Sequence, residues 1–491
     1  MGESCHVEYK LNYNYTQGSG MSLLYLPDEL LLSIGEHVIS EHDLNSFHQA
    51  NRRLYLVFDE YRYKYNAKHH EGHALYWAAR HGNATAARKS VIAGTSLDPR
   101  PWPFTWLREY PFDRHPSIEK YNGGPYWVED PLTQTVMWNK PEVTKTLLEL
   151  GAYQKSMDVN SAGQPERLIL WAAGRNCAAS LKELLSHGVD VNTRGDSSTG
   201  RTALLVAARR GNLETVEALL QHGADTELQD MLTGWRPLHW AARLGHFSVL
   251  GLLLGSGAEI DARMSFSLDT PILLAAKHCE FDAMNMLLDR GANVDFVGID
   301  NRTVLFHVVR KGSTELIKRV LCKGVRPDIT CLFEALSNWE RDDHYERAKL
   351  LLEHGASPNI PLNTPKGPKF LLPWVIRQWY LNVGVTELLL EYGVDVNTTG
   401  PGRFTPLLSV VFDEPVFKMA QLLLDHGADP NAANEKGVTP LVICAGKGNV
   451  DVSKLLLKHG ADPNVDVKGQ TLLARAAKWG RGDIVELLKN V

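Results

Sequence analysis

Apolar residues along most of this chain fall into pairs of short helical patterns, and a glycine closes each pair. The clearest stretch, residues 234–261, reads GWRPLHWAARLGHFSVLGLLLGSGAEID. Leu238, Ala241 and Ala242 lie three and four residues apart behind Pro237, which predicts a short first helix with a narrow apolar side. A second helix before the closing glycine is predicted by Phe247, Val249, Leu250, Leu252, Leu253 and Leu254.

The closing phrase returns along the chain as two leucines, two variable residues, a glycine and a small residue. Neighbouring glycines of this phrase are 31 to 38 residues apart. A period of this length indicates stacked repeats, in which each helix pair buries its apolar side against the next pair. The closing glycines are Gly151, Gly188, Gly223, Gly257, Gly291, Gly324, Gly355, Gly393, Gly427 and Gly460.

The openings of the first helices are also alike. They read RPLHWAA from Arg236, TPILLAA from Thr270 and TPLVICA from Thr439, and two units end in HGAD-x-N. On these residues the chain resembles ankyrin-repeat proteins over residues 71–491. The resemblance implies an all-α fold, an ankyrin-repeat solenoid of about 12 helix pairs, and a protein that binds other proteins.

The period is interrupted by residues 99–131, which are rich in proline and aromatic residues. A loop of this length is usually functional or disordered, and aromatic residues argue against disorder. Two interpretations stay open: the rings pack on neighbouring repeats, or the insert binds a partner. A second proline-rich insert, residues 361–369, is predicted to be a spacer.

The segment of residues 22–66 has a different pattern and follows a polar stretch, residues 1–21, that we expect to be disordered. Its apolar spacing predicts three short helices, the third over residues 52–61. The run Leu26-Pro27-Asp28-Glu29-Leu30, followed by Ile34, Asp43-Leu44 and Arg53-Leu54, resembles an F-box. That family docks target receptors onto the Skp adaptor of cullin–RING ubiquitin ligases.

By position, the resemblance implies a set of apolar contacts with the Skp-type adaptor. These are Leu26, Pro27, Leu30, Leu31, Ile34, Val38, Leu44 and Phe47. The alternative is that the three helices only cap the open end of the repeat stack, because solenoid ends need a covering element. Both roles are compatible with the pattern.

Composition narrows the choice of partner and compartment. The net charge is -5 and the pI is about 6.4, so no basic domain suggests nucleic-acid binding. No apolar stretch approaches the ~20 residues of a membrane span. The six cysteines show no C-x-x-C pair or disulfide-like spacing, which fits a reducing compartment. We expect a cytoplasmic protein, with the nucleus also open.

Catalytic and metal-binding patterns are not found. His69, His70, Glu71 and His73 are a dense group, but the zincin pattern needs glutamate directly after the first histidine, and Gly72 interrupts the helix. Histidines that precede closing glycines, such as His187 and His222, are expected to bond the last helical carbonyls. We therefore expect no enzyme, no metal and no cofactor.

Cations recur near the ends of the predicted first helices: Arg80, Arg209, Arg243, Lys277, Arg310, Lys447 and Lys478. They either balance the negative helix end or line the concave side of the solenoid and bind an acidic or phosphorylated segment. From repeat position, the candidate target contacts are Arg209, Gln229, Met231, Trp235, Arg243 and Lys277.

Together these features predict a protein-binding adaptor. The first hypothesis is a substrate receptor of a Skp–cullin–F-box ubiquitin ligase whose ankyrin repeats hold an unknown target protein. The second is an ankyrin scaffold or inhibitor without a ligase, in which the N-terminal helices are only a cap.

Overall fold

The structure is a computed structural model of the 491-residue chain. It describes residues 31, 59, 62–68, 72–97, 130–152, 164–195, 199–337, 342–365, 367–378, 383–413, 417–466 and 469–490. The chain divides into two compact units, residues 1–232 and residues 233–491, and each is described by itself.

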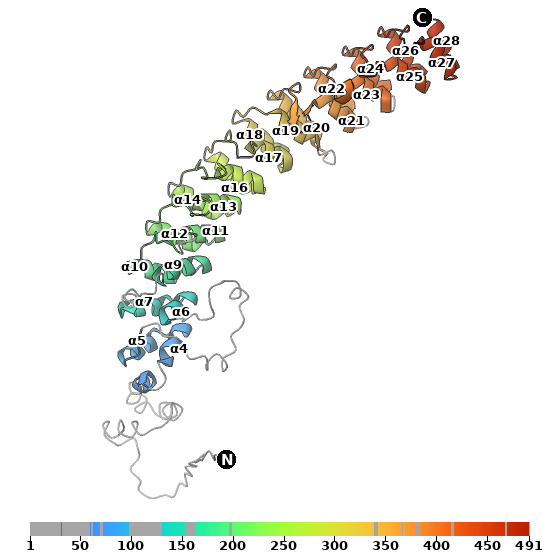
Figure 1. The fold of residues 1–491 in the computed structure, drawn as a ribbon. Helices are drawn as coiled ribbons and strands as arrows, with labels where there is room; N and C mark the ends of the chain where they lie inside the picture. Colours follow the sequence, from blue (N-terminus) through green and yellow to red (C-terminus); the bar gives the residue numbers. More distant parts are fainter. Residues whose placement is uncertain are drawn as a thin grey trace, which may run out of the picture. The chain divides into compact units, whose positions relative to one another are not determined.

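The first unit contains four helix pairs among its described residues (Figure 1). In each pair a first helix is followed by a second helix that packs beside it. The pairs are α4 (His73–His81) with α5 (Ala84–Ile92), α6 (Pro131–Met137) with α7 (Pro141–Glu149), α9 (Gln164–Arg175) with α10 (Ala178–Ser186), and α11 (Ala203–Arg210) with α12 (Leu213–Gln221).

The second unit contains eight more pairs among its described residues. They are α13 (Pro237–Arg243) with α14 (Phe247–Gly255), α15 (Pro271–His278) with α16 (Phe281–Asp289), α17 (Val304–Lys311) with α18 (Thr314–Leu321), α19 (Ile329–Ser337) with α20 (His344–Glu353), α21 (Leu371–Gln378) with α22 (Val383–Glu391), α23 (Pro406–Asp413) with α24 (Phe417–Asp425), α25 (Pro440–Lys447) with α26 (Val450–Lys458), and α27 (Leu472–Lys478) with α28 (Gly482–Lys489). A short 3₁₀ helix, η3 (Pro401–Arg403), precedes α23.

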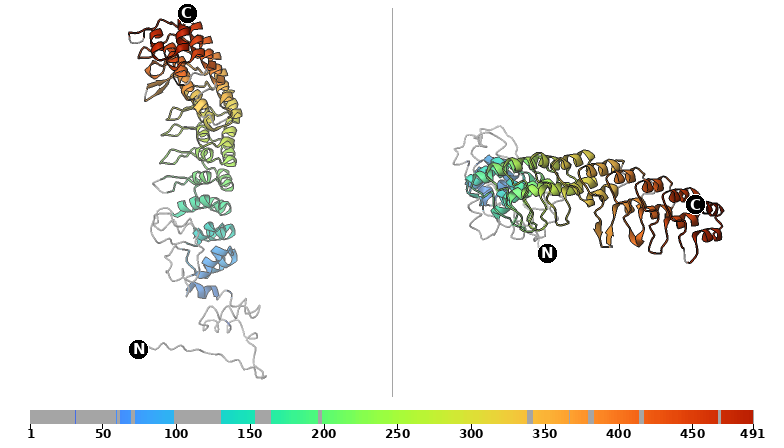
Figure 2. Two further views of the ribbon diagram at one scale, coloured as in Figure 1. Left: turned by 90° about the vertical axis from the view of Figure 1, so that its right-hand side faces the viewer. Right: turned by 90° about the horizontal axis from the view of Figure 1, so that it is seen from above.

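Within each unit, helices of the same kind pack on one another. First helices α13, α15, α17 and α19 lie in sequence, and so do second helices α18, α20, α22 and α24. In the second unit the loops between successive pairs project to one side of the helices (Figure 2). We call each of these loops a finger. The predicted ankyrin fold with about 12 helix pairs is confirmed by the four described pairs of the first unit and the eight of the second.

The closing glycines have the backbone conformation that the pattern requires. Gly257, for example, has φ +88°, a left-handed conformation that residues with a Cβ rarely adopt. An added Cβ there would meet nothing within 4 Å, so the requirement for glycine is conformational and not steric. All ten closing glycines have positive φ, which confirms where the second helices end.

The predicted core of the clearest repeat is largely correct. Leu238, Ala241 and Ala242 are buried in α13, and Val249, Leu250 and Leu253 are buried in α14. Phe247, which also belongs to the apolar pattern, is 48% exposed at the start of α14. Its position in the first turn lies outside the stripe that faces the neighbouring helices.

Both predicted inserts hold secondary structure at residues that the structure describes. Pro131 is not loop but the first residue of α6, and the Asp130 side chain caps this helix by accepting a hydrogen bond from the Thr133 N–H at 2.6 Å. Residues 361–369 hold an antiparallel hairpin, β1 (Leu362–Thr364) and β2 (Gly367–Lys369), which the sequence did not predict, and their role as a spacer stays a prediction. The rest of the first insert lies outside the described residues.

Candidate protein-binding surface

Three of the predicted target contacts lie in the first unit. Arg209 is exposed in the last turn of α11. Gln229 and Met231 lie in the loop after α12, where the Gln229 carbonyl accepts a hydrogen bond from Arg194 and the Met231 N–H donates to the Thr199 carbonyl at 2.9 Å. The Met231 side chain is 63% exposed. Their role as target contacts stays a prediction.

Trp235 and Arg243 come together in the second unit. The Trp235 and Trp240 ring centroids are 4.3 Å apart, and the Arg243 guanidinium lies over both rings, 5.0 Å from the Trp235 centroid. Arg243 Nε donates to His278 Nε2 at 3.1 Å, so this histidine nitrogen must be unprotonated. Burial, with the nearby Arg243 charge, lowers the pKa of His278.

Lys277, the sixth predicted contact, is already bound to carboxylates of its own chain. Its ammonium lies 2.8 Å from Asp269 Oδ1 and 3.6 Å from Asp300 Oδ1, and Asp269 is buried. These acids belong to successive fingers, so the ion pairs join neighbouring repeats. An incoming acidic ligand would have to compete with both carboxylates.

The other predicted cations near first-helix ends have mixed surroundings. Arg310 lies 3.5 Å from a Glu334 carboxylate oxygen, and Lys447 donates to the Phe412 carbonyl. Arg80 lies over the Trp138 ring at 5.3 Å. Cations at this repeat position therefore contact a neighbouring repeat, the following one for Arg80 and Arg310 and the preceding one for Lys447.

Three further cations near the fingers were not predicted as contacts. Arg263 lies 4.8 Å above the Phe296 ring, and Arg302 lies 4.4 Å above the Phe306 ring. In the hairpin, Lys369 lies 4.5 Å above the Trp374 ring, and burial lowers the pKa of its ammonium. A weak sequence signal exists: a cation stands four or five residues before an aromatic residue of the next first helix, at Arg302 and at Lys369.

Large apolar side chains are exposed at two finger tips of the second unit. Phe266 is 70% exposed and Ile299 is 75% exposed, with Leu268 beside Phe266 at 45%. The Ile299 N–H donates to the Ser267 carbonyl at 3.2 Å, which holds the two tips together. Burying such side chains against a partner is favourable.

The histidines near closing glycines play the predicted structural part. Nδ1 of His187, His222, His354 and His426 lies 2.8 to 2.9 Å from the carbonyl four residues earlier. Because a carbonyl only accepts, Nδ1 carries the proton in each bond. His459 is different, since its Nε2 lies 3.5 Å from Asp425 Oδ1.

Most predicted adaptor contacts lie outside the described residues: Leu26, Pro27, Leu30, Ile34, Val38, Leu44 and Phe47. Leu31 is described, and it is helical and fully buried. The role of these eight residues as adaptor contacts stays a prediction. Of the third predicted helix, residues 52–61, only residue 59 is described, and it is helical; residues 62–68, beyond the predicted end, are helical as well.

Asp59 and the helical residues 62–68 contact the first repeat. The Asp59 carboxylate pairs with the Lys89 ammonium, and Asn66 Oδ1 accepts a hydrogen bond from the Ala74 N–H at 2.9 Å. Asn66 thereby satisfies a free N–H at the start of α4, where the flanking Gly72 has no side chain to do so.

Metal-ligating side chains and long apolar helices are two further features that bear on function. Of the predicted histidine group, His73 begins α4, while His69, His70 and Glu71 lie outside the described residues. Among the described residues, no group of three or more histidine, cysteine or acidic side chains is placed to hold a metal ion. No described helix is long and apolar enough to cross a membrane.

Comparison with known proteins identifies the class of the chain. The model of three-copy ankyrin repeats matches residues 168–264, 272–361 and 411–490, which is more than half of the chain. The protein belongs to the ankyrin-repeat family. No F-box model matches the N-terminal segment.

A curated relative shares one stretch of this chain. It is the glycerophosphocholine phosphodiesterase GDE1 of Candida albicans, 31% identical over 109 residues. The match covers 22% of this chain and only 9% of that protein. It is therefore a similarity between short segments and supports no transfer of activity.

Proposed function

We propose that this protein is a non-catalytic adaptor of the cell interior that holds a target protein on its ankyrin repeats and brings it to a Skp–cullin–F-box ubiquitin ligase. The ankyrin family supports the protein-binding half of this proposal. The observation that carries the ligase half is the Leu26-Pro27-Asp28-Glu29-Leu30 run placed ahead of a repeat array.

The N-terminal segment and the repeats would bind different partners. Leu26, Pro27 and Leu30 would contact the adaptor, while the exposed side chains of the fingers would contact the target. No covalent step is assigned to this chain, because its contribution is to position the target near the ubiquitin-loading machinery.

Co-purification with the Skp-type adaptor tests the ligase half. We expect the full-length chain to retain the adaptor and the double variant Pro27→Ser/Leu30→Asp to lose it. Lys68→Asp is the matched control, because it places the same charge at an exposed site beyond the motif. Adaptor binding that survives the double variant would contradict the proposal, and unchanged thermal unfolding of the repeats would show that the fold persists.

A specific observation favours the second candidate, a scaffold whose N-terminal helices only cap the repeats. The Asp59–Lys89 ion pair and the Asn66 bond to Ala74 are contacts that a cap requires. This candidate predicts that deletion of residues 22–66 destabilises the first unit but leaves target binding unchanged, with no adaptor captured in either case.

A further inference from the structure

We propose that the finger side of the second unit, from Trp235 to Trp374, binds an extended target segment in which acidic and apolar side chains alternate. This inference rests on the protein-binding function proposed above and names the chemistry of the partner. Its elements are the cations Arg243, Arg263, Arg302 and Lys369 and the exposed tips Phe266, Leu268 and Ile299.

The four cations differ from their neighbours in having no carboxylate partner among the described residues. Lys277 and Arg310 are each within 4 Å of an acid of the same chain. Arg243, Arg263, Arg302 and Lys369 instead lie over aromatic rings, with Arg243 also bonded to the uncharged His278. A ring covers one face of a guanidinium and leaves its N–H edges able to bind a carboxylate.

The rings also hold the cations in place before a ligand arrives. Phe306 under Arg302 is buried, and so is Phe333, which lies 5.3 Å from the Lys369 ammonium. Because these rings are fixed in the packed first helices α17 and α19, the cations above them lose less side-chain entropy on binding. These preorganised cations should therefore bind a carboxylate more favourably than flexible cations would.

The apolar finger tips should favour ligands that also carry apolar side chains. Phe266 belongs to the same finger as Arg263, and Ile299 to the same finger as Arg302. Each finger therefore presents one apolar and one cationic side chain. A ligand that satisfies both needs apolar side chains between its acidic ones.

Repeat spacing sets the expected spacing of the acids. Packed helices lie about 8–10 Å apart, and an extended polyproline II segment advances about 3.1 Å per residue with three residues per turn, so every third side chain points the same way. Arg263 and Arg302, which lie on successive fingers, are therefore matched by acidic residues about three positions apart in such a segment.

Single-stranded nucleic acid is also anionic, but the surface suits it less well. Successive bases bind by stacking on a series of exposed aromatic faces. Phe266 is exposed at a finger tip, but Phe306, Phe333 and Trp240 are buried beneath or beside cations. The protein as a whole carries a net charge of -5, which disfavours a polyphosphate backbone. The peptide is the better match.

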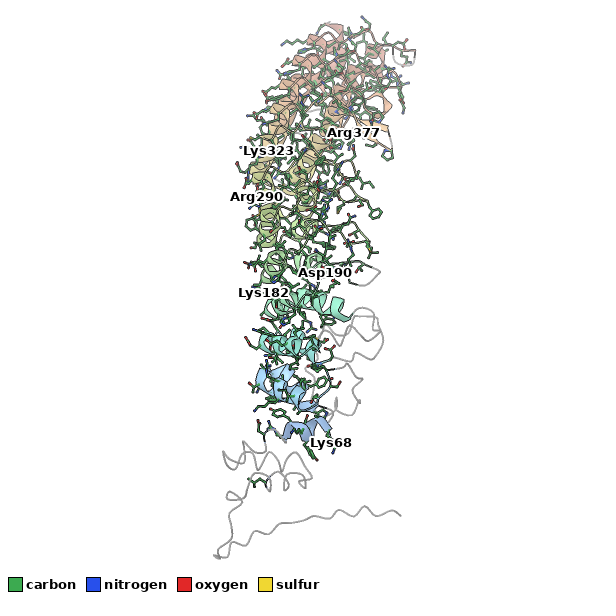
Figure 3. The ribbon with its side chains drawn as sticks, turned by 90° about the vertical axis from the view of Figure 1, so that its left-hand side faces the viewer. Lys68, Lys182, Asp190, Arg290, Lys323 and Arg377 are labelled. Atoms are coloured by element: carbon green, nitrogen blue, oxygen red, sulfur yellow. The ribbon has the colours of Figure 1, made fainter. Side chains whose placement is uncertain are left out.

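The test uses the full-length protein and a fluorescent synthetic peptide of about 15 residues that repeats Glu-Leu-Ser, which places an acid at every third position. A matched peptide has Gln for Glu, and an oligouridine of equal net charge represents nucleic acid. The binding variant is Arg263→Gln/Arg302→Gln. The control variant is Arg290→Gln/Lys323→Gln, which removes the same charge. Both residues lie at the ends of second helices, and they are on the opposite side of the second unit from Arg377 of α21 (Figure 3).

We expect fluorescence anisotropy to show binding of the Glu peptide, with affinity weakened on the order of tenfold by the Arg263→Gln/Arg302→Gln variant and unchanged in the control variant. Phe266→Ser/Ile299→Ser should weaken it as well, without altering its salt dependence. Superimposable thermal unfolding curves would confirm that all variants fold.

Several outcomes would overturn the inference: no binding of the Glu peptide, equal binding of the Gln peptide, equal loss in the control variant, or tighter binding of oligouridine. None of them bears on adaptor co-purification, which depends on Pro27 and Leu30. The failure of this surface is therefore distinguishable from failure of the ligase proposal.

Discussion

Two neighbouring repeat pairs in the second unit solve the same packing problem with different chemistry. We call the two repeats formed by α13 to α16 the regular pair. In it, the residues eight positions before the closing glycines are Val249 and Ala283, both buried and apolar. In the irregular pair, α17 to α20, one of the equivalent positions holds Arg347, which is only 1% exposed. A charged side chain occupies a place that elsewhere needs only small or apolar volume.

The first helix of the irregular pair explains why a cation is acceptable there. α17 ends at Gly312 with φ -76°, while α15 ends at Cys279 in a left-handed conformation. Arg347 supplies donors to this end, with Nη1 2.7 Å from the Val309 carbonyl and Nη2 2.6 Å from the Gly312 carbonyl. Asp343 balances the charge at 2.7 Å.

The comparison shows two kinds of repeat interface: an apolar one that tolerates substitution, and a polar one that depends on specific partners. An apolar interface loses stability in proportion to the volume removed. A buried guanidinium such as that of Arg347 is different, because removing it leaves the polar groups that it contacts without compensation. The irregular pair should therefore be the more sensitive of the two.

The largest expected effect follows from replacing the buried cation. Arg347→Leu should destabilise the second unit by about 3–5 kcal/mol, because two buried carbonyls and the Asp343 carboxylate lose their guanidinium partner. Urea unfolding measures this loss, and hydrogen exchange should locate it in α17 to α20. Lys318→Leu, at an exposed site of α18, is the control. Equal stability of both variants would remove the distinction between the two interfaces.

Acid sensitivity should be shared by both repeat pairs. Burial lowers the pKa of His239 in α13 from 6.5 to about 4, and burial with the Lys277 charge lowers the pKa of His307 in α17 to about 4. Between these values the unfolded chain binds more protons than the folded one, so stability is lost as pH falls from 6.5 toward 4. We expect a loss on the order of 2–3 kcal/mol, measured by urea unfolding at several pH values. A flat profile in this window would contradict it.

The same two histidines should respond differently to removal of their nitrogens. His239 Nδ1 accepts from the Arg236 N–H at 3.1 Å and Nε2 donates to the Ala262 carbonyl at 2.9 Å, whereas His307 Nε2 is buried without a hydrogen-bond partner. His239→Leu should therefore cost about 1–3 kcal/mol, and His307→Leu should be neutral or stabilising. Thermal unfolding of the two variants at neutral pH compares them directly. A loss for His307→Leu as large as that for His239→Leu would contradict the assignment.

The regular repeats were predictable from the sequence because their signals are local. A left-handed closing residue selects glycine, and the apolar spacing of Leu238, Ala241 and Ala242 selects the buried side of a helix. Both signals lie within one repeat and recur in the next. The count of about 12 helix pairs follows from them.

The irregular pair was not predictable in the same way. Arg347 stands in the charged run ERDDHYERAK, which resembles an exposed turn. Its burial depends on carbonyls 35 and 38 residues earlier and on the extended conformation of Gly312. The candidate binding surface shows the same limit, because Lys277 was predicted as a contact without knowledge of the buried Asp269 beside it.

The smallest expected effect concerns the ends of the two first helices. Cys279 ends α15 with φ 65°, a conformation that is strained for any residue with a Cβ. Cys279→Gly should stabilise the regular pair by up to about 1 kcal/mol, since relief of this strain outweighs the added freedom of glycine in the unfolded chain. Gly312 ends α17 in an ordinary conformation, but an added Cβ would lie 2.8 Å from the Val308 carbonyl oxygen. Gly312→Ala should therefore destabilise the irregular pair for a steric reason, and thermal unfolding separates the two cases by the sign of the shift. If both substitutions lowered the unfolding temperature, the left-handed strain at Cys279 would be compensated by contacts of its side chain, and the difference between the two helix ends would be one of packing alone.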